Sequence, residues 1–202
     1  MMAFIKEVFR GIRVLVLIWI LTAIIYPLGI LNLGQWVFPF TANGSILFNI
    51  NAEPMGSFLI GQSFTSEQYF QSRPSAIRYS QGKKSGPYGI SGGSNLSASN
   101  PQLIDRISQE VSQLKEEDLK PIPDLIYTSG SGLDPHISWK AARQQLPRVA
   151  KARGMKEDEI EGLMYKYTDG KFLGIFGEAV VNVLRLNYAL DLQSVNQGEQ
   201  EQ

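Results

Sequence analysis

The longest uninterrupted apolar run of the chain covers residues 14–31, and it reads VLVLIWILTAIIYPLGIL without a charged side chain. Twelve of its eighteen residues are Val, Leu or Ile. An uncharged run of about 18 apolar residues is long enough to cross the hydrocarbon core of a bilayer as a helix. We therefore predict a transmembrane helix over residues 14–35. Pro27 should kink or loosen it near one end, because proline lacks the N–H that a helix interior needs.

Charges on the two sides of this run predict its orientation. The three basic side chains that precede it are Lys6, Arg10 and Arg13. Glu7 is the only acidic residue among them, and the next basic residue after the run is Arg73. Basic flanks of a membrane span stay in the cytoplasm. The prediction is a single-pass protein of the inner (cytoplasmic) membrane, with residues 1–13 inside and everything after the helix outside.

Two other interpretations of the apolar run have to be weighed. A cleaved signal peptide also has a basic start and an apolar centre, but its apolar region is usually shorter and is followed by a cleavage site between small residues. The sequence YPLGILNLGQW that follows here is bulky. A helix buried in a soluble core would carry one polar face, which this run lacks.

Beyond residue 36 the apolar positions recur mainly at helical spacing. A helix is predicted over 101–120, with Asn100 as its cap and Pro101 in the first turn. A second helix is predicted over 139–153, closed by Gly154 and kinked or divided at Pro147. A third is predicted over 156–167, and its inward-facing side chains are Ile160, Leu163, Met164 and Tyr167.

Short β-prone segments lie outside these helices. They occupy residues 45–48, 125–127 and 179–186, and the last of them, AVVNVLRL, has the strongest strand signal. The mixture predicts an α+β fold, in which one transmembrane helix is followed by a single soluble domain with a small sheet over residues 36–192. Residues 79–98 predict a long loop rich in Gly and Ser. Residues 193–202 are rich in Gln and Glu and predict a disordered tail.

Composition excludes several kinds of chemistry. The chain has no Cys and a single His, His136. Disulfides, thiolate catalysis and metal sites built from several cysteines or histidines are therefore excluded. Residues 36–202 carry 16 basic and 18 acidic side chains, so this part of the chain has no basic field that would attract nucleic acid.

One short segment contains the residue types of a serine hydrolase: Ser129, Ser131, Asp134 and His136. A catalytic triad needs such side chains to converge in space, and the G-x-S-x-G elbow of many hydrolases is missing here. An extracytoplasmic serine hydrolase that uses His136 is one interpretation. The others are a binding loop, or a glycine-rich turn in which Asp134 caps the following helix.

Other polar segments give weaker signals. The glycine-rich stretches at 91–94 (SGGS) and 130–132 (GSG) do not match the phosphate-binding pattern G-x-x-x-x-G-K-[ST]. Gln144 and Gln145 lie between two arginines on the helix predicted over 139–153, and the default interpretation of such a pattern is an exposed polar face.

An ordered series of motifs points to a known family. The motifs are G-x-W-x-F-P-x-x-A-N-G-S at 34–45, G-S-x-L-I-G-Q-x-F at 56–64, Y-F-x-x-R-P-S-A at 69–76, S-G-G-S-N-L at 91–96, S-N-P at 99–101, S-G-L-D-P-H-I-S at 131–138, A-A-x-x-Q-x-P-R-V-A-x-A-R at 141–153 and V-N-V-L-x-L-N-x-A-L-D at 181–191. Together they resemble the C subunits of the prokaryotic Kdp potassium-transporting ATPase. The resemblance covers nearly the whole chain.

The resemblance implies a non-catalytic subunit of an ATP-driven potassium uptake complex. Its partners would be a channel-like potassium-selective subunit, an ATP-hydrolysing P-type subunit and a very small peptide. In this family the C subunit is described as an assembly factor and as a catalytic chaperone that raises the ATP affinity of the ATP-hydrolysing subunit. By position, the family's nucleotide-contacting residues correspond to Ser91, Gly92, Gly93, Ser94 and Gln145.

The predicted orientation conflicts with direct contact between these residues and cytosolic ATP. A domain outside the membrane would instead cap the outer mouth of the potassium-selective subunit and stabilise the complex. Its effect on ATP would then be allosteric, through contacts that differ between two states of the pump. Direct nucleotide binding requires the opposite orientation.

Overall fold

The computed structural model of the chain describes residues 1–49, 52–82 and 89–200, with the backbone alone for 195–200. It divides into two compact units, Met1–Met55 and Gly56–Gln202. Two predictions lie partly outside the described residues. They are the long loop at 79–98, of which 83–88 lie outside, and the tail at 193–202, of which 201–202 lie outside.

The first unit is dominated by a continuous helical rod. It consists of α1 (Met2–Ile20), a π-helical turn η1 (Leu21–Ile25) and α2 (Tyr26–Val37). The rod is long and apolar enough to cross a membrane, and none of its residues is buried. A helix of a soluble core would be covered by other elements, so this exposure supports a single membrane span. The limits 14–35 for the part within the bilayer stay a prediction.

Pro27 explains the π-helical turn. The N–H of Tyr26 donates to the carbonyl of Leu21, five residues back instead of four. A proline ring in a regular helix would collide with the carbonyl four residues earlier, here that of Ala23. The wider turn just before Pro27 relieves this crowding. The predicted loosening at Pro27 is therefore confirmed.

A short connection follows the rod. It contains the single helical turn α3 (Pro39–Ala42), the strand β1 (Ile46–Phe48) and the strand β2 (Pro54–Ser57), and β1 and β2 pair with each other. The strand predicted at 45–48 is confirmed.

The second unit is built around a small antiparallel sheet. Its strands are β3 (His136–Ser138), β4 (Thr168–Asp169) and β5 (Val180–Asn182), in the order β3-β5-β4. The central strand places Val181 opposite Ile137 on one side and opposite Thr168 on the other. The predicted α+β class, with one N-terminal apolar helix and a small sheet, is confirmed.

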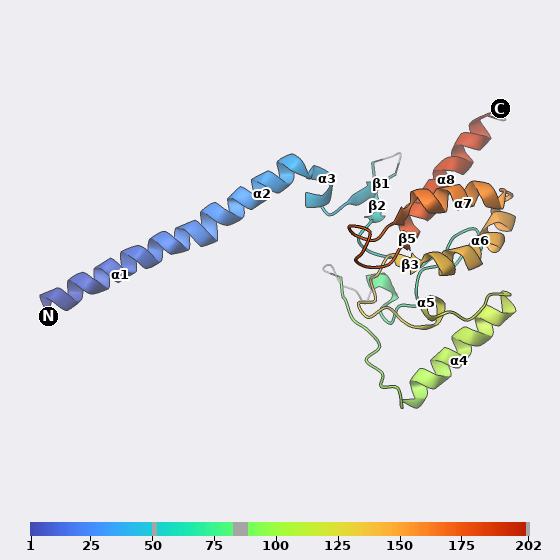
Figure 1. The fold of residues 1–202 in the computed structure, drawn as a ribbon, viewed down its shortest axis with the longest axis horizontal. Helices are drawn as coiled ribbons and strands as arrows, with labels where there is room; N and C mark the ends of the chain where they lie inside the picture. Colours follow the sequence, from blue (N-terminus) through green and yellow to red (C-terminus); the bar gives the residue numbers. More distant parts are fainter. Residues whose placement is uncertain (50–51, 83–88, 201–202) are drawn as a thin grey trace. The chain divides into compact units, whose positions relative to one another are not determined.

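Three helices pack with this sheet and form the core: α6 (Trp139–Arg153), α7 (Glu157–Lys166) and α8 (Val183–Gln200). Figure 1 shows them gathered together, whereas α4 (Pro101–Glu116) lies at the edge of this unit and is reached by an extended segment. The core side chains from these helices include Val149, Ile160, Met164, Leu186 and Leu190.

Local signals placed the start of α4 and the end of α6 correctly, whereas α4 ends at Glu116 and not at the predicted residue 120. The Asn100 side chain accepts a hydrogen bond from the N–H of Gln102 at 2.9 Å and caps α4. Gly154 closes α6 with a left-handed φ of 67°. Pro147 does not break α6. It has no N–H for the carbonyl of Arg143, but Pro147 and Arg143 both lie on the exposed side of the helix.

Three local predictions were wrong. Residues 125–127 do not form a strand, because Pro123 starts a helical turn, α5 (Pro123–Ile126). The strand predicted over 179–186 ends at Asn182, whose side chain accepts from the N–H of Arg185 at 3.1 Å and so caps α8. Ser138, rather than Asp134, caps α6 by accepting from the N–H of Ala141.

The C-terminal helix reaches into the predicted tail. Its backbone is helical to Gln200. Disorder over 193–202 stays a prediction.

We predict that Gly154→Ala destabilises the domain by about 1 kcal/mol, because a side chain is disfavoured in the left-handed conformation. An added Cβ at Gly154 meets no atom within 4 Å, so the effect would be purely conformational. Gly162→Ala, in the middle of α7 and equally uncrowded, is the matched control and should stabilise by roughly 0.5–1 kcal/mol. Urea unfolding of the detergent-solubilised chain measures both, and equal effects of the two substitutions would contradict the argument.

Candidate functional site

Residues 67–71 form an irregular segment whose backbone is held by side chains. Gln145 on α6 accepts from the N–H of Gln71 at 2.7 Å and donates to the carbonyl of Gln71 at 3.1 Å. Asn187 on α8 does the same for Phe70, with both bonds at 2.9 Å. Each amide side chain therefore makes the two backbone hydrogen bonds that a neighbouring strand would make. We call residues 67–71 the clamped segment.

Two arginines complete the hold on the clamped segment. Arg148 donates to the carbonyls of Glu67 at 2.8 Å and Tyr69 at 3.1 Å, and also to the side-chain oxygen of Gln145. Arg153 donates to the carbonyl of Gln68 at 2.6 Å and to Asp191 at 2.8 Å. Its guanidinium also lies over the ring of Tyr69, 5.0 Å from the centroid. The segment is thus fixed from both α6 and α8.

Gln145 is fully buried, so the interpretation of its neighbourhood as an exposed polar face was wrong for this residue. Its side-chain oxygen already accepts two hydrogen bonds, and its amide nitrogen donates to Gln71. The Gln145 side chain therefore has a structural role, which is to bond the backbone of Gln71.

The glycine-rich stretch 91–94 packs against the loop 129–132. The N–H of Gly92 and the hydroxyl of Ser91 both donate to the carbonyl of Ser131, at 2.8 and 3.0 Å. A Cβ added to Gly93 would lie 2.9 Å from the carbonyl oxygen of Gly130. Glycine is required here because two backbones approach each other closely. Ser94 is half-buried.

The predicted nucleotide-site residues therefore contact two different parts of the second unit. Ser91, Gly92 and Gly93 contact the loop 129–132, whereas Gln145 contacts Gln71 and Arg148. Residues 91–94 bring no basic side chain, and the N–H of Gly92 is already bonded. This donor set does not fit a polyphosphate, which binds to free backbone N–H groups and cations.

His136 lies between two arginine–carboxylate ion pairs. Its Nδ1 is 3.4 Å from Asp134, and its Nε2 is 3.6 Å from Asp169. Arg73 approaches Asp134 and Arg185 approaches Asp169, each at 3.5 Å. Both ring nitrogens of His136 thus face carboxylates rather than a serine hydroxyl, which argues against a hydrolase triad.

The serines of the proposed triad are engaged elsewhere. Ser129 is buried, its hydroxyl lies 3.3 Å from that of Ser131, and it accepts from the N–H of Gly132. The hydroxyl of Ser131 accepts from the N–H of Leu133. These contacts are those of a tight turn.

Asp134 organises the start of β3. It accepts from the N–H of His136 at 3.0 Å and pairs with the imidazole and with Arg73. The hydrogen bond from the His136 side chain is the largest cause that holds the pKa of Asp134 below its usual value, against the opposing effect of burial.

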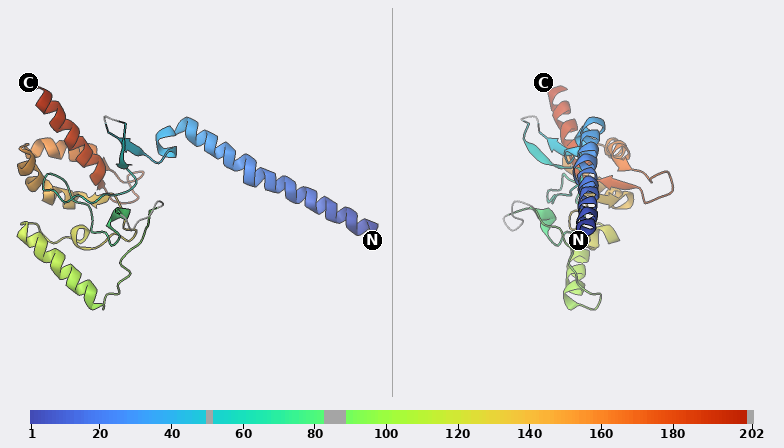
Figure 2. Two further views of the ribbon diagram at one scale, coloured as in Figure 1. Left: turned by 180° about the vertical axis from the view of Figure 1, so that it is seen from behind. Right: turned by 90° about the vertical axis from the view of Figure 1, so that its left-hand side faces the viewer.

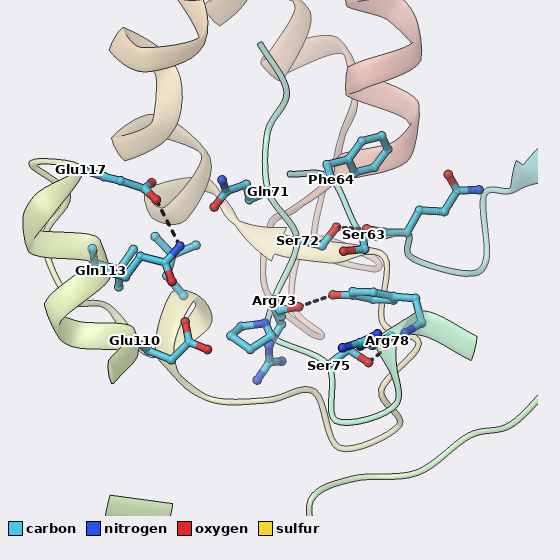
Figure 3. A pocket seen from close by; sticks show the side chains of 15 residues that line it. Ser63, Phe64, Gln71, Ser72, Arg73, Ser75, Arg78, Glu110, Gln113 and Glu117 are labelled. Atoms are coloured by element: carbon cyan, nitrogen blue, oxygen red, sulfur yellow. Dashed lines mark hydrogen bonds between the residues drawn. The ribbon is translucent and has the colours of Figure 1, made fainter. Parts of the chain in front are cut away.

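A polar pocket of about 190 Å³ lies beside the clamped segment, and the sequence analysis did not anticipate it. Figure 3 shows Glu110 and Gln113 of α4, and Glu117 directly after it, on one wall, facing the chain around Gln71 and Arg73. The Nε of Arg73 and one oxygen of Glu117 are buried without a hydrogen-bond partner. Burial raises the pKa of Glu110.

Arg78 and Tyr79, which line this pocket, belong to an unusual backbone turn. Arg78, Tyr79 and Ser80 have positive φ values of 51°, 53° and 58°, although none is glycine. The Tyr79 hydroxyl donates to the carbonyl of Arg73, and the hydroxyl of Ser75 accepts from the N–H of Tyr79 at 3.0 Å. Burial raises the pKa of Tyr79 to about 12. The sequence signals for this region were the motif Y-F-x-x-R-P-S-A at 69–76 and the long loop predicted over 79–98.

We predict that Gln145→Leu destabilises the domain by roughly 2–4 kcal/mol, because it leaves the N–H and carbonyl of Gln71 without partners. Gln144→Leu is the matched control on the same helix, since the side-chain oxygen of Gln144 is buried without a hydrogen bond. Urea unfolding of the full chain compares the two variants. Equal stability losses would mean that the amide clamp is not needed.

We further predict an acid-dependent contribution from Asp134. Its folded pKa lies below the ordinary 3.8, so its charge stabilises the fold above that value, and this stability is lost as the pH falls through the lower folded pKa. Asp134→Asn keeps an acceptor for the N–H of His136 but removes the charge. The stability difference between the original chain and this variant should be constant above about pH 5 and shrink below about pH 4. A stability difference between the two chains that stays constant down to pH 2 would refute this contribution of the Asp134 charge.

Comparison with known proteins gives the family. A model of the family KdpC, described as K+-transporting ATPase, c chain, matches residues 8–192. The potassium-transporting ATPase KdpC subunit 2 of Nostoc sp. (strain PCC 7120) is 65% identical over 195 residues, which cover 96% of this chain and 98% of that relative. The KdpC subunit of Synechocystis sp. (strain PCC 6803) is 55% identical over 181 residues, which cover 90% and 95%.

A more distant relative is the potassium-transporting ATPase KdpC subunit of Gloeobacter violaceus, with 42% identity over 187 residues, which cover 92% of this chain and 96% of the relative. The match to the family model includes the apolar run 14–31, the clamped segment, the glycine-rich stretch and α8 up to residue 192. The chain therefore belongs to the KdpC family, the c chain of the K+-transporting ATPase, as an accessory subunit rather than the catalytic one.

Proposed function

We propose that the domain after the membrane span works outside the cytoplasm, as a rigid body that caps the potassium-selective subunit and stabilises the assembled ATPase complex. Any effect on the ATP affinity of the ATP-hydrolysing subunit is then allosteric. The observation that carries this proposal is the engagement of Gln145, whose amide is bonded to Gln71 and Arg148.

The packing of the glycine-rich stretch supports the same proposal. Ser91 and Gly92 use their donors on the carbonyl of Ser131, and Gly93 lies against Gly130. We propose that residues 91–94 and Gln145 matter because they set the shape of the domain. A change at either place would alter the surface that the partner subunits contact, without any contact to nucleotide.

The charge pattern supports the orientation. The cationic side chains before the apolar run, Lys6, Arg10 and Arg13, lie in the first part of α1 and are exposed, and Arg10 pairs with Glu7 at 2.6 Å. No Lys or Arg follows until Arg73. This asymmetry favours an N-terminus inside. A domain outside the inner membrane has no access to cytosolic ATP, so its influence on the ATP-hydrolysing subunit has to pass through the partners.

The experiment that tests the proposal determines topology, and the absence of Cys makes it clean. We predict that Ser91→Cys, at an exposed position, is labelled by a membrane-impermeant maleimide in cells with an intact inner membrane. Ala3→Cys, exposed at the N-terminal end of the rod, is the matched control and should be labelled only after lysis.

The reverse pattern, with Ala3→Cys labelled in intact cells and Ser91→Cys only after lysis, would overturn the orientation. Direct nucleotide contact would then be the better explanation for residues 91–94 and Gln145. The potassium uptake of both variants should be measured in parallel, so that labelling is assessed only in assembled, working complexes.

A further inference from the structure

The connection between β4 and β5 carries four large apolar side chains that face solvent. The exposed fractions are 71% for Phe172, 75% for Leu173, 75% for Ile175 and 62% for Phe176. In the right-hand view of Figure 2 this orange-red connection stands clear of the helices of its unit. We call residues 171–177 the apolar tip.

The apolar tip is a formed turn. The N–H of Phe172 donates to the carbonyl of Phe176 at 2.8 Å, and the N–H of Phe176 donates to the carbonyl of Phe172 at 3.0 Å. Gly174 and Gly177 have left-handed φ values of 75° and 82°, and Leu173 shares this conformation at 52°. The apolar side chains are therefore presented by a closed turn, which lowers the entropy cost of docking.

Charged residues surround the base of the tip. Asp169 ends β4, Lys171 begins the tip and Glu178 follows it, and all three are exposed. Arg185 pairs with Asp169 at 3.5 Å. The stretch 172–177 itself has no charged side chain. An apolar end above a charged base suits a medium that is apolar inside and polar at its surface.

The bilayer that the chain's own helix spans is such a medium, and the chain keeps the tip within a limited distance of it. Residues 38–55 connect the membrane span to the second unit, and even fully extended they reach only about 60 Å. The second unit, which carries the tip, is therefore tethered near a bilayer surface at high effective concentration. A specific protein interface normally uses about 20–30 residues on each side, far more than this small tip with its charged base provides.

We propose that the apolar tip inserts its four apolar side chains into the interfacial layer of the bilayer that the chain's own helix spans. The domain then touches the membrane at two places, the span and the tip. Lipid acyl chains and the headgroup boundary cover Phe172, Leu173, Ile175 and Phe176, and the charged base stays among the headgroups. This contact does not depend on which side of the membrane the domain occupies.

The test uses the full chain reconstituted alone in phosphatidylcholine vesicles, and the absence of other cysteines allows single-site labelling. A polarity-sensitive fluorophore is attached at Ile175→Cys. Lipids that carry a nitroxide near the headgroup should quench it about twofold, because the label would lie within the interfacial layer. Ser108→Cys, exposed on α4, is the matched control and should not be quenched.

A second substitution keeps the proposal open to refutation. Phe172→Glu places a carboxylate in the tip and should abolish the quenching at Ile175→Cys, because a charge is costly among acyl chains. The absence of quenching in the original tip would overturn the proposal. Protection of the Ile175→Cys label only after the other subunits are added would assign the tip to a protein surface instead. Either result leaves the topology experiment with Ser91→Cys unaffected.

Discussion

Backbone polar groups that are removed from water need partners, and residues 67–71 obtain theirs from side chains. A strand would supply these partners from another strand. Here Gln145 and Asn187, on two different helices, each bond the N–H and carbonyl of one residue of the segment. The clamped segment therefore joins α6 to α8. Its exact path also fixes where Arg73 and Ser75 lie, and with them the wall of the polar pocket and the turn at 78–80.

The glycine-rich parts of the domain follow the same principle of close backbone contact. Gly93 allows the approach of Gly130, and the neighbouring N–H of Gly92 donates to Ser131. A second set of contacts links four parts of the domain. Arg73 at the pocket wall contacts Asp134, and Asp134 contacts His136 at the start of β3. His136 also contacts Asp169 of β4, which pairs with Arg185 of α8. These contacts link the elements of the second unit to one another. The proposed capping role requires a rigid body, because contacts with partners can then distinguish between states of the pump.

The membrane shapes the surface as much as the core does. The helical rod exposes apolar side chains along its whole length, and a soluble domain could not tolerate this. The apolar tip repeats the pattern on a smaller scale between β4 and β5. Two apolar features that are separate in the sequence thus share one physical explanation, contact with lipid. This explanation remains a proposal for the tip, whereas length and composition support it for the rod.

Local patterns by themselves determined the elements whose signals lie within a few residues. The uncharged run gave the rod, Pro27 gave its loosened turn, Asn100 and Gly154 gave helix ends, and the spacing of Ile160 and Met164 gave the buried face of α7. The ordered motifs gave the family. Tertiary structure decided the rest, since it depends on partners distant in the sequence. The apolar residues Val183, Leu184 and Leu186 suit a strand or a buried helix equally well, and the cap at Asn182 selected the helix. Gln145 resembled any exposed glutamine until Gln71, 74 residues away, became its partner. Periodicity records which face of an element is buried, but it does not record which backbone a buried amide will bond.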